Sequence, residues 1–260
     1  MDLGIAGRKA IVCASSRGLG FACAKALAQA GCEVVINGRD EARLAAAAAA
    51  LKKFANSARI IPVAADVATS AGQQAPLAAC AQPDILVNNN GGPPFRDFRE
   101  LDRQKMLDGV IANMVIAIEL IQKVIDPMIA RKFGRIVNIT SASVKMPLAG
   151  LDLSSGARAG LTAFLAGVAR TVAPSNVTIN FVLPGTFDTD RFRSNVEATA
   201  KKKNISHDAA FAERVATIPA KRIGQPDELG TMCAFLCSTY AGYITGQNIL
   251  IDGGTFSGAF

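Results

Sequence analysis

A serine and an arginine stand four residues apart in LDLSSGARAGL, residues 151–161. We expect this segment to be helical, and residues four apart on a helix lie one turn apart on the same face. Ser154 offers a hydroxyl, and Arg158 offers a lasting positive charge with five N–H donors. Such a pair either performs chemistry or marks a place where chemistry has been lost.

A glycine-containing loop, CASSRGLG at residues 13–20, follows a strand-like run and opens a helical segment. Gly18 and Gly20 allow the backbone to approach a pyrophosphate closely, and the N–H groups and dipole at a helix start favour its negative charge. Two glycines alone are weak evidence, but the order of strand, loop and helix favours a nucleotide-binding site.

The residue inventory sets several other chemistries aside. His207 is the single histidine, so neither a histidine-based metal cluster nor a Ser-His-Asp triad is expected, and we predict no bound metal. The six cysteines form no Cys-x-x-Cys motif, so we expect buried free thiols in a reducing cytoplasm. Cys233 and Cys237 have the spacing of a packed helix face more than that of a redox pair.

Neither a secretory signal nor a membrane span is apparent. The first residues, MDLGIAGRKAIVC, lack a basic stretch followed by a long apolar run. The apolar segment 110–125 is interrupted by Asn113, Glu119 and Gln122, and no run approaches the ~20 residues that cross a bilayer. We therefore expect a soluble, cytoplasmic protein without a membrane partner.

The net charge is +7, and the densest basic run is Lys201–Lys203, with Arg191 and Arg193 just upstream. A solvated, mobile face explains this run. The alternative is a landing site for an acidic partner, such as an acyl carrier protein, a coenzyme A phosphate or a nucleic acid. Aromatic residues do not alternate with the basic ones, so nucleic acid is the weakest of these and we expect none to bind.

Strand-like apolar runs alternate with helical segments along the whole chain. The runs lie at residues 9–14, 33–37, 59–65, 84–89, 135–140, 177–183 and 248–252. Their β-branched character suits a parallel sheet that is covered on both faces. The pattern predicts one α/β domain with a doubly wound (Rossmann) sheet of about seven strands and a less regular substrate-loop insertion at about 186–215. Ligands of such sheets bind beyond the carboxyl ends of the strands.

Several motifs, in order, resemble those of the short-chain dehydrogenase/reductase family. The loop at 13–20 resembles Thr-Gly-x-x-x-Gly-x-Gly, with Cys13 and Ala14 in place of the Thr and the first Gly. NNNG at 88–91 resembles Asn-Asn-Ala-Gly, and PGTFDT at 184–189 resembles Pro-Gly-x-x-x-Thr. RIGQPDELG and ITGQNILIDGG match the family's C-terminal region, so the resemblance covers the whole chain and is greatest to 3-oxoacyl-(acyl-carrier-protein) reductases.

The resemblance implies a nicotinamide cofactor at the carboxyl edge of the sheet. Residues expected to contact it are Ser15, Ser16, Arg17, Gly18, Leu19, Gly20, Arg39, Asp66, Val67, Asn88, Asn90, Gly91, Arg158, Pro184, Gly185, Phe187 and Thr189. Gly38 stands where NAD-dependent members of the family carry Asp, and Arg17 and Arg39 could clamp a 2′-phosphate unless they are ordinary surface charges. We predict NADP(H) in preference to NAD(H).

The resemblance also implies a set of catalytic positions. Asn113 matches the family Asn that fixes a proton-relaying water, and Ser141 matches the Ser that orients the carbonyl oxygen. The family Tyr and Lys, which donate a proton and hold the ribose, are matched by Ser154 and Arg158. Both tyrosines of the chain lie in its C-terminal segment and cannot restore the motif by a small shift.

These replacements affect proton donation more than cofactor binding. An aliphatic hydroxyl is a far weaker acid than a phenol, which starts near pKa 10. Arg158 keeps the charge of the family Lys, so binding of the ribose could survive. Asp152 could supply a proton instead, but residues i and i+2 of a helix point apart.

The leading hypothesis is an NADP-dependent oxidoreductase that transfers hydride between its cofactor and a carbonyl or alcohol. Ser141 and Arg158 would polarise the carbonyl, and Ser154 or a water would pass the proton. The alternative is a catalytically silent NADP-binding homologue that acts as a sensor or partner subunit; non-redox chemistry in the same pocket is a third. We expect a small-molecule or acyl-thioester substrate, and a homotetramer or dimer built, as in the family, through the helices at 100–131 and 152–172.

The cofactor prediction can be tested by titrating the protein with NADPH and NADH in parallel. NADPH should bind more tightly, because its 2′-phosphate meets two arginines and no carboxylate at position 38. Tighter binding of NADH would overturn the prediction.

Overall fold

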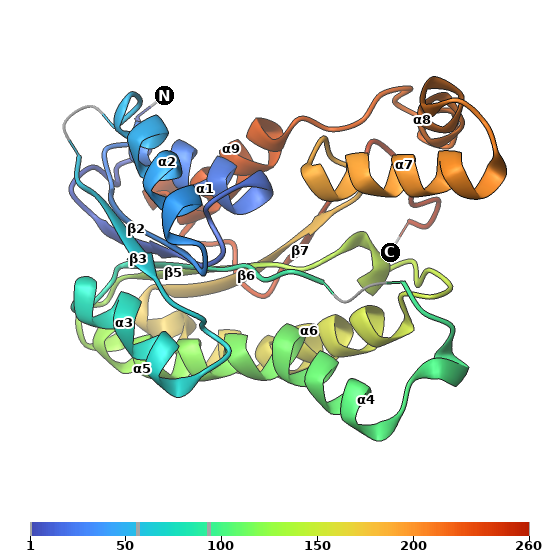
Figure 1. Ribbon diagram of the computed structural model, residues 1–260. Coiled ribbons are helices and arrows are strands. Elements are labelled where there is room, and N and C mark those ends of the chain that lie inside the picture. The colour runs from blue at the N-terminus through green and yellow to red at the C-terminus, as the bar shows by residue number, and fades with distance from the viewer. Residues whose placement is uncertain (1, 56–57, 93–94, 260) are drawn as a thin grey trace.

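Seven parallel strands form one sheet in the order β3-β2-β1-β4-β5-β6-β7 (Figure 1). The computed structural model describes residues 2–55, 58–92 and 95–259. The strands are β1 (Lys9–Val12), β2 (Glu33–Gly38), β3 (Ile60–Ala64), β4 (Ile85–Asn88), β5 (Gly134–Ile139), β6 (Val177–Pro184) and β7 (Asn248–Ile251). The predicted doubly wound fold is confirmed, and every predicted strand is present with small shifts at its ends.

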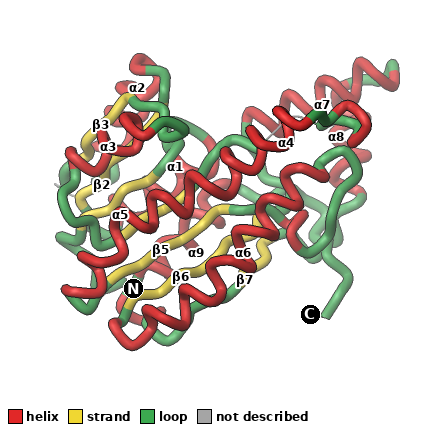
Figure 2. Tube along the Cα trace, turned by 90° about the horizontal axis from the view of Figure 1, so that it is seen from below, coloured by secondary structure: helices red, strands yellow, loops and turns green. Residues whose placement is uncertain are grey.

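Helices cover both faces of the sheet. One face carries α1 (Gly18–Gln29), α2 (Glu41–Lys52) and α9 (Pro226–Cys237), as Figure 1 shows. The other carries α3 (Ser70–Ala79), α4 (Arg103–Val110), α5 (Ile116–Ala130) and α6 (Asp152–Val172). On this face α5 and α6 lie side by side across the strands (Figure 2). No helix of the described residues is long and apolar enough to cross a membrane.

The apolar runs form strands because both of their faces are buried. Side chains alternate along a strand, so Val12 packs in the core beneath α1 and α9 whereas its neighbour Ile11 packs beneath α5 and α6. All six cysteines lie buried within these cores as free thiols, which confirms the expectation for their side chains.

The segment at 186–215 is more regular than we expected. It forms α7 (Asp190–Lys203) and α8 (His207–Ala216), which extend beyond the sheet in Figure 1. The two helices share a small apolar cluster of their own, to which Phe192 and Ala210 contribute. One ion pair also joins them, since Lys203 Nζ of α7 lies 2.6 Å from Glu213 Oε2 of α8. Within α7, Lys201 Nζ lies 2.8 Å from Glu197 Oε1. Helix α7 was not predicted because it has few apolar residues, and those residues pack on α8.

The close packing of α9 on α1 yields a stability prediction. A Cβ at Gly230 in α9 would lie 2.4 Å from the carbonyl oxygen of Ala22, whereas one at Gly167 in α6 would meet nothing within 4 Å. Gly230→Ala should therefore lower the free energy of unfolding by about 1–3 kcal/mol through overpacking. Gly167→Ala, the matched control, should raise it by about 0.5–1 kcal/mol because alanine costs less backbone entropy in a helix. Urea unfolding measures both, and equal effects would contradict the packing.

Candidate active site

The predicted site residues gather along one edge of the sheet, because all seven strands are parallel and their carboxyl ends lie together. The glycine loop follows β1, Arg39 follows β2, and Asp66 and Val67 follow β3. Asn88 ends β4 and is followed by Asn90 and Gly91; Ser141 follows β5, and Pro184 ends β6 before Gly185, Phe187 and Thr189. Tertiary structure thus brings together segments that are far apart in the sequence.

Arg158 lies at the centre of this arrangement. Its side chain is buried, with 7% of the residue exposed. Its Nε donates to Ser154 Oγ at 3.2 Å, its Nη1 to the Ile139 carbonyl at 2.9 Å and its Nη2 to the Asn90 carbonyl at 3.4 Å. In the described part of the chain no carboxylate pairs with it. Burial, and to a smaller extent the positive charge of Arg191, lower the pKa of Arg158 to about 10.

Ser154 is the hydroxyl partner of this guanidinium and is itself buried. Its neighbour Ser155 is equally buried but donates to the Leu151 carbonyl one turn back, at 3.0 Å. Asp152 is exposed and accepts from the backbone N–H of Gly150 at 3.2 Å. Asp152 therefore lies away from Ser154, as the helical spacing predicted.

Ser141 stands two residues beyond the carbonyl that Arg158 bonds, at the end of β5. Its Oγ accepts from the backbone N–H of Ser143 at 3.1 Å and so caps a short turn. Its own O–H donates to no described acceptor. The hydroxyl is therefore held in place while its proton can still be donated to a ligand.

Asn113 lies in a π-helical turn, Ile111–Val115, that joins α4 to α5. Asn113 Nδ2 donates to the Gly109 carbonyl one turn back, at 3.0 Å. Among the residues that the structure describes, its buried Oδ1 has no hydrogen-bond partner, and neither has Oδ1 of Asn88. Both residues line an internal cavity of about 30 Å³ together with Arg158, which is room for a water.

The glycine loop is held by groups of β1 and β2. Ser15 is fully buried; its Oγ donates to the Val12 carbonyl at 2.7 Å and accepts from the Asn37 N–H at 3.0 Å. Ala14 adopts φ +45°, at the position where the resemblance places a glycine. A Cβ at Gly20 would lie 2.4 Å from the Ala14 carbonyl, so only glycine fits there. Ser15 thus shapes the loop, and the backbone around Gly18–Gly20 remains for a ligand.

Asn89 is a functional residue that the sequence analysis missed. Its Nδ2 donates to the Ala14 carbonyl at 3.1 Å and approaches that of Cys13 at 3.4 Å, which fastens the glycine loop to the end of β4. The NNNG motif at residues 88–91 was the sequence pattern that could have pointed to Asn89. Asn90 in the same motif donates from Nδ2 to the Ala112 carbonyl at 2.8 Å and accepts from the Gly91 N–H.

The two arginines predicted to bind a phosphate form ion pairs with different carboxylates. Arg17 Nη1 lies 3.0 Å from Asp190 Oδ2 at the start of α7, and Arg39 Nη1 lies 3.8 Å from Asp66 Oδ2. Both are largely exposed, so solvent screens these pairs and leaves the guanidinium groups available. At the end of β2, a Cβ at Gly38 would lie 3.1 Å from Ser16 Oγ, so a larger acidic side chain would crowd Ser16.

The segment after β6 lies over the glycine loop. Gly185 N–H donates to the Ile251 carbonyl at 2.8 Å, and a Cβ there would touch Asp252 at 2.7 Å. Thr189 caps α7 by accepting from the Phe192 N–H at 3.3 Å, and its methyl group lies 3.7 Å from the Cβ position of Gly18. Of the remaining predicted contacts, Phe187 and Val67 are buried and Leu19 is partly buried.

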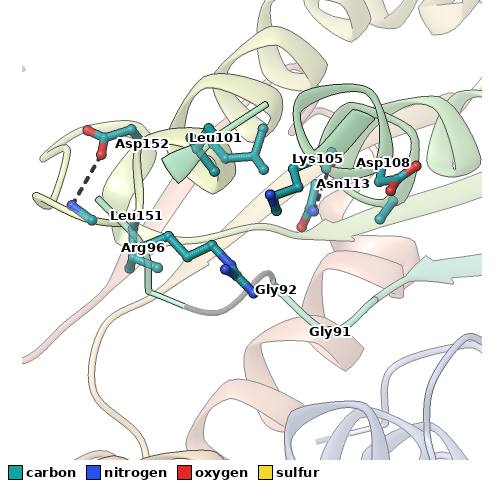
Figure 3. A pocket seen from close by; sticks show the side chains of 13 residues that line it. Gly91, Gly92, Arg96, Leu101, Lys105, Asp108, Asn113, Leu151 and Asp152 are labelled. Atoms are coloured by element: carbon teal, nitrogen blue, oxygen red, sulfur yellow. Dashed lines mark hydrogen bonds between the residues drawn. The ribbon is translucent and has the colours of Figure 1, made fainter. Parts of the chain in front are cut away.

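A larger cavity of about 270 Å³ opens beside these groups (Figure 3). Its walls come from the loop after β4, from α4 and the π-helical turn, and from the start of α6. Asn113 lines both this cavity and the internal one that contains Arg158. The arrangement therefore leaves a cavity for a small molecule beside the carboxyl ends of the strands.

Comparison with known proteins identifies the family. The family model described as enoyl-(acyl carrier protein) reductase matches residues 13–255. The chain is 33% identical over 252 residues to the NADPH-dependent reductase BacG of Bacillus subtilis, covering 95% of this chain and 97% of that protein. It is 29% identical over 262 residues to the 3-oxoacyl-(acyl-carrier-protein) reductase FabG of Chlamydia pneumoniae, covering 98% and 99%. The chain belongs to the short-chain dehydrogenase/reductase family.

A solved structure is similar over nearly the whole chain. It is the apo structure of a short-chain oxidoreductase from Pseudomonas aeruginosa PAO1 that contains an atypical catalytic center. The TM-score is 0.89 at 27% identity, and the match covers 98% of this chain and 100% of that one. The fold predicted from the motifs is thus that of the family.

The contact between Ser154 and Arg158 leads to a prediction. Ser154→Ala should lower the free energy of unfolding by about 1–3 kcal/mol, because Nε of the buried guanidinium would lose its acceptor. Ser155→Ala is the matched control, since it removes an equally buried hydroxyl that bonds only within its own helix. That control should change stability by less than about 0.5 kcal/mol. Urea unfolding of both variants measures the difference, and equal losses would refute the role assigned to Ser154.

Proposed function

We propose that the protein is an NADP(H)-dependent oxidoreductase that transfers hydride between the cofactor and a carbonyl or alcohol substrate, in the manner of 3-oxoacyl thioester reductases. The observation that carries this proposal is the buried Arg158 guanidinium, which has no carboxylate partner in the described chain and contacts Ser154. A desolvated positive charge of this kind stabilises negative charge on a reacting oxygen more strongly than it would in water.

The residues at the strand ends fit the cofactor. Gly20 leaves no space for a side chain where the loop must lie close to its helix, and the start of α1 provides N–H groups for phosphates. The crowding of position 38 by Ser16, together with exposed Arg17 and Arg39, supports NADP(H) in preference to NAD(H). The relative BacG is an NADPH-dependent reductase. When bound, the cofactor supplies or accepts the hydride.

Ser141 and Arg158 act on the substrate oxygen. The Oγ of Ser141 already accepts a backbone hydrogen bond, so its O–H is oriented to donate to a carbonyl. The Arg158 guanidinium has N–H groups beyond the three that bond Ser154, Ile139 and Asn90. These donors stabilise the alkoxide that develops on carbonyl reduction, and Arg158 also holds the ribose of the cofactor.

The proton reaches the alkoxide through Ser154 or a water. Ser154 accepts from Arg158 Nε, which makes its hydroxyl a somewhat better donor, but an aliphatic hydroxyl remains a weak acid. The unpaired Oδ1 atoms of Asn113 and Asn88 beside the internal cavity are suited to hold a water there. Turnover is therefore slower than in tyrosine-containing relatives, by about 10²–10⁴-fold if no other acid serves.

A catalytically silent NADP(H)-binding protein, acting as a sensor or partner subunit, is the second candidate. The absence of a tyrosine from the site favours it, since both tyrosines lie at the surface in the C-terminal segment. Under either function, we propose that the protein is cytoplasmic and forms a homo-oligomer. Exposed apolar residues on α4 and α6, among them Leu107 and Phe164, support assembly through these helices.

The functions are separated by measuring NADPH binding and then NADPH oxidation with a panel of ketones and 3-oxoacyl thioesters. We expect tight binding and slow turnover. Ser141→Ala should reduce turnover by about 10²-fold or more while NADPH still binds, because it removes a donor to the substrate oxygen and no donor to the cofactor. Binding without turnover of any substrate would instead support the silent protein.

The double variant Ser154→Tyr with Arg158→Lys provides the complementary test. It introduces a phenol beside an amine, and carbonyl reduction should increase because a phenol is the stronger proton donor. A folded double variant that binds NADPH and shows no increase would contradict the placement of Ser154 at the proton-donor position.

A further inference from the structure

Three guanidinium groups surround the residues that follow β4. Arg158 Nη2 donates to the Asn90 carbonyl at 3.4 Å, and Arg191 Nη1 donates to the Gly92 carbonyl at 3.1 Å. Arg96 lines the larger cavity together with Gly92. The charge of Arg191 lowers the pKa of Arg158, so these cations are close enough to repel one another. Like charges held together in this way favour the binding of an anion.

Two cationic side chains reach into the larger cavity. Figure 3 shows Arg96 and Lys105 extending from opposite walls toward the same central space above Gly92. Lys105 Nζ pairs with Asp102, the residue that caps the start of α4. The Arg96 side chain forms no hydrogen bond or ion pair with any residue that the structure describes, whereas nearby Arg99 pairs with Asp97 at 3.1 Å. Arg96 is therefore available to a ligand.

Among the residues that the structure describes, neither carboxylate of the cavity pairs with Arg96. Asp152 and Asp108 lie toward opposite sides of the cavity in Figure 3. Asp152 Oδ2 accepts from the Gly150 N–H at 3.2 Å, and Asp108 Oδ1 accepts from Gln104 Nε2 at 2.8 Å. Each accepts a hydrogen bond from a neutral neighbour, and neither forms an ion pair with Arg96 or Lys105 in the described chain.

The start of α6 adds to the positive potential. Residues 150–153 line the cavity, and no side chain caps the helix at Leu151. The first N–H groups of an α-helix lack carbonyl partners within it, and the helix dipole places partial positive charge at this end. Together with Arg96 and Lys105, these groups provide charge and hydrogen bonds for a planar anion.

We propose that this cavity binds a carboxylate of the substrate between Arg96 and Lys105, so that the substrate is a small oxo acid. The inference rests on the proposed function. Asn113 lines both cavities, which directs the carbonyl end of such a molecule toward Arg158. A volume of about 270 Å³ suits a small acid and lies below the range of sites for larger ligands. Arg96 would then determine specificity.

The test compares levulinate, a small oxo acid, with its uncharged methyl ester, both added to the NADPH-loaded protein. Calorimetry measures binding, and NADPH oxidation measures turnover. Levulinate should bind at least about tenfold more tightly than the ester, and Arg96→Gln should remove this preference, because a hydrogen bond between charged groups contributes about that much. Arg96→Lys should restore part of it. Arg99→Gln is the matched control on the same loop and should leave it unchanged.

The outcomes separate this inference from the proposed function. If levulinate binds preferentially, this preference depends on Arg96 and no turnover is seen, the reductase function is refuted and the carboxylate site is supported. Turnover of ketones or 3-oxoacyl thioesters with no preference for the acid, or a preference that survives Arg96→Gln, would overturn the carboxylate site and leave the reductase function. Both residues are exposed, so neither substitution is expected to unfold the protein.

Discussion

The buried guanidinium of Arg158 is the interaction on which the candidate site depends. It links the carbonyl at the end of β5 to the loop after β4 and to the first turn of α6. Burying a cation is costly unless its donors are satisfied, and here two carbonyls and the hydroxyl of Ser154 satisfy three of them. Because no carboxylate of the described chain neutralises it, the charge remains available to a ligand. The same contacts that hold three segments together thus create the positive potential of the site.

Binding and proton transfer depend on different parts of the molecule. The strand edge at which we propose that the nucleotide binds is shaped by Ser15, Asn89 and Gly20, and their contacts do not involve Ser154. In the proposed reaction, proton transfer depends on one side chain at one place, Ser154. A protein of this family can therefore lose rate while it keeps its cofactor site. The similar structure with an atypical catalytic center belongs to the same fold.

Much of the fold and part of the site could be predicted from the sequence. Seven apolar runs, the helix at 152–172 and the motif at 13–20 are local patterns, and local patterns determine strands, helices and tight turns. The spacing of Ser154 and Arg158 correctly placed them one turn apart. The segment at 186–215 was harder, since its helices have few apolar residues and are stabilised by packing on each other.

The contacts that give the site its charge could not be read from the order of residues. The cations of the site come from distant parts of the chain: Arg96, Lys105 and Arg191 are separated by up to about a hundred positions from the groups they approach. Nothing in the adjacent residues indicates that their side chains lie near one another. The sequence established the elements and the chemical groups, because both depend on residue type and on near neighbours. Tertiary folding decided which groups meet, which charges lack partners and where a cavity remains, because these depend on the packing of distant segments.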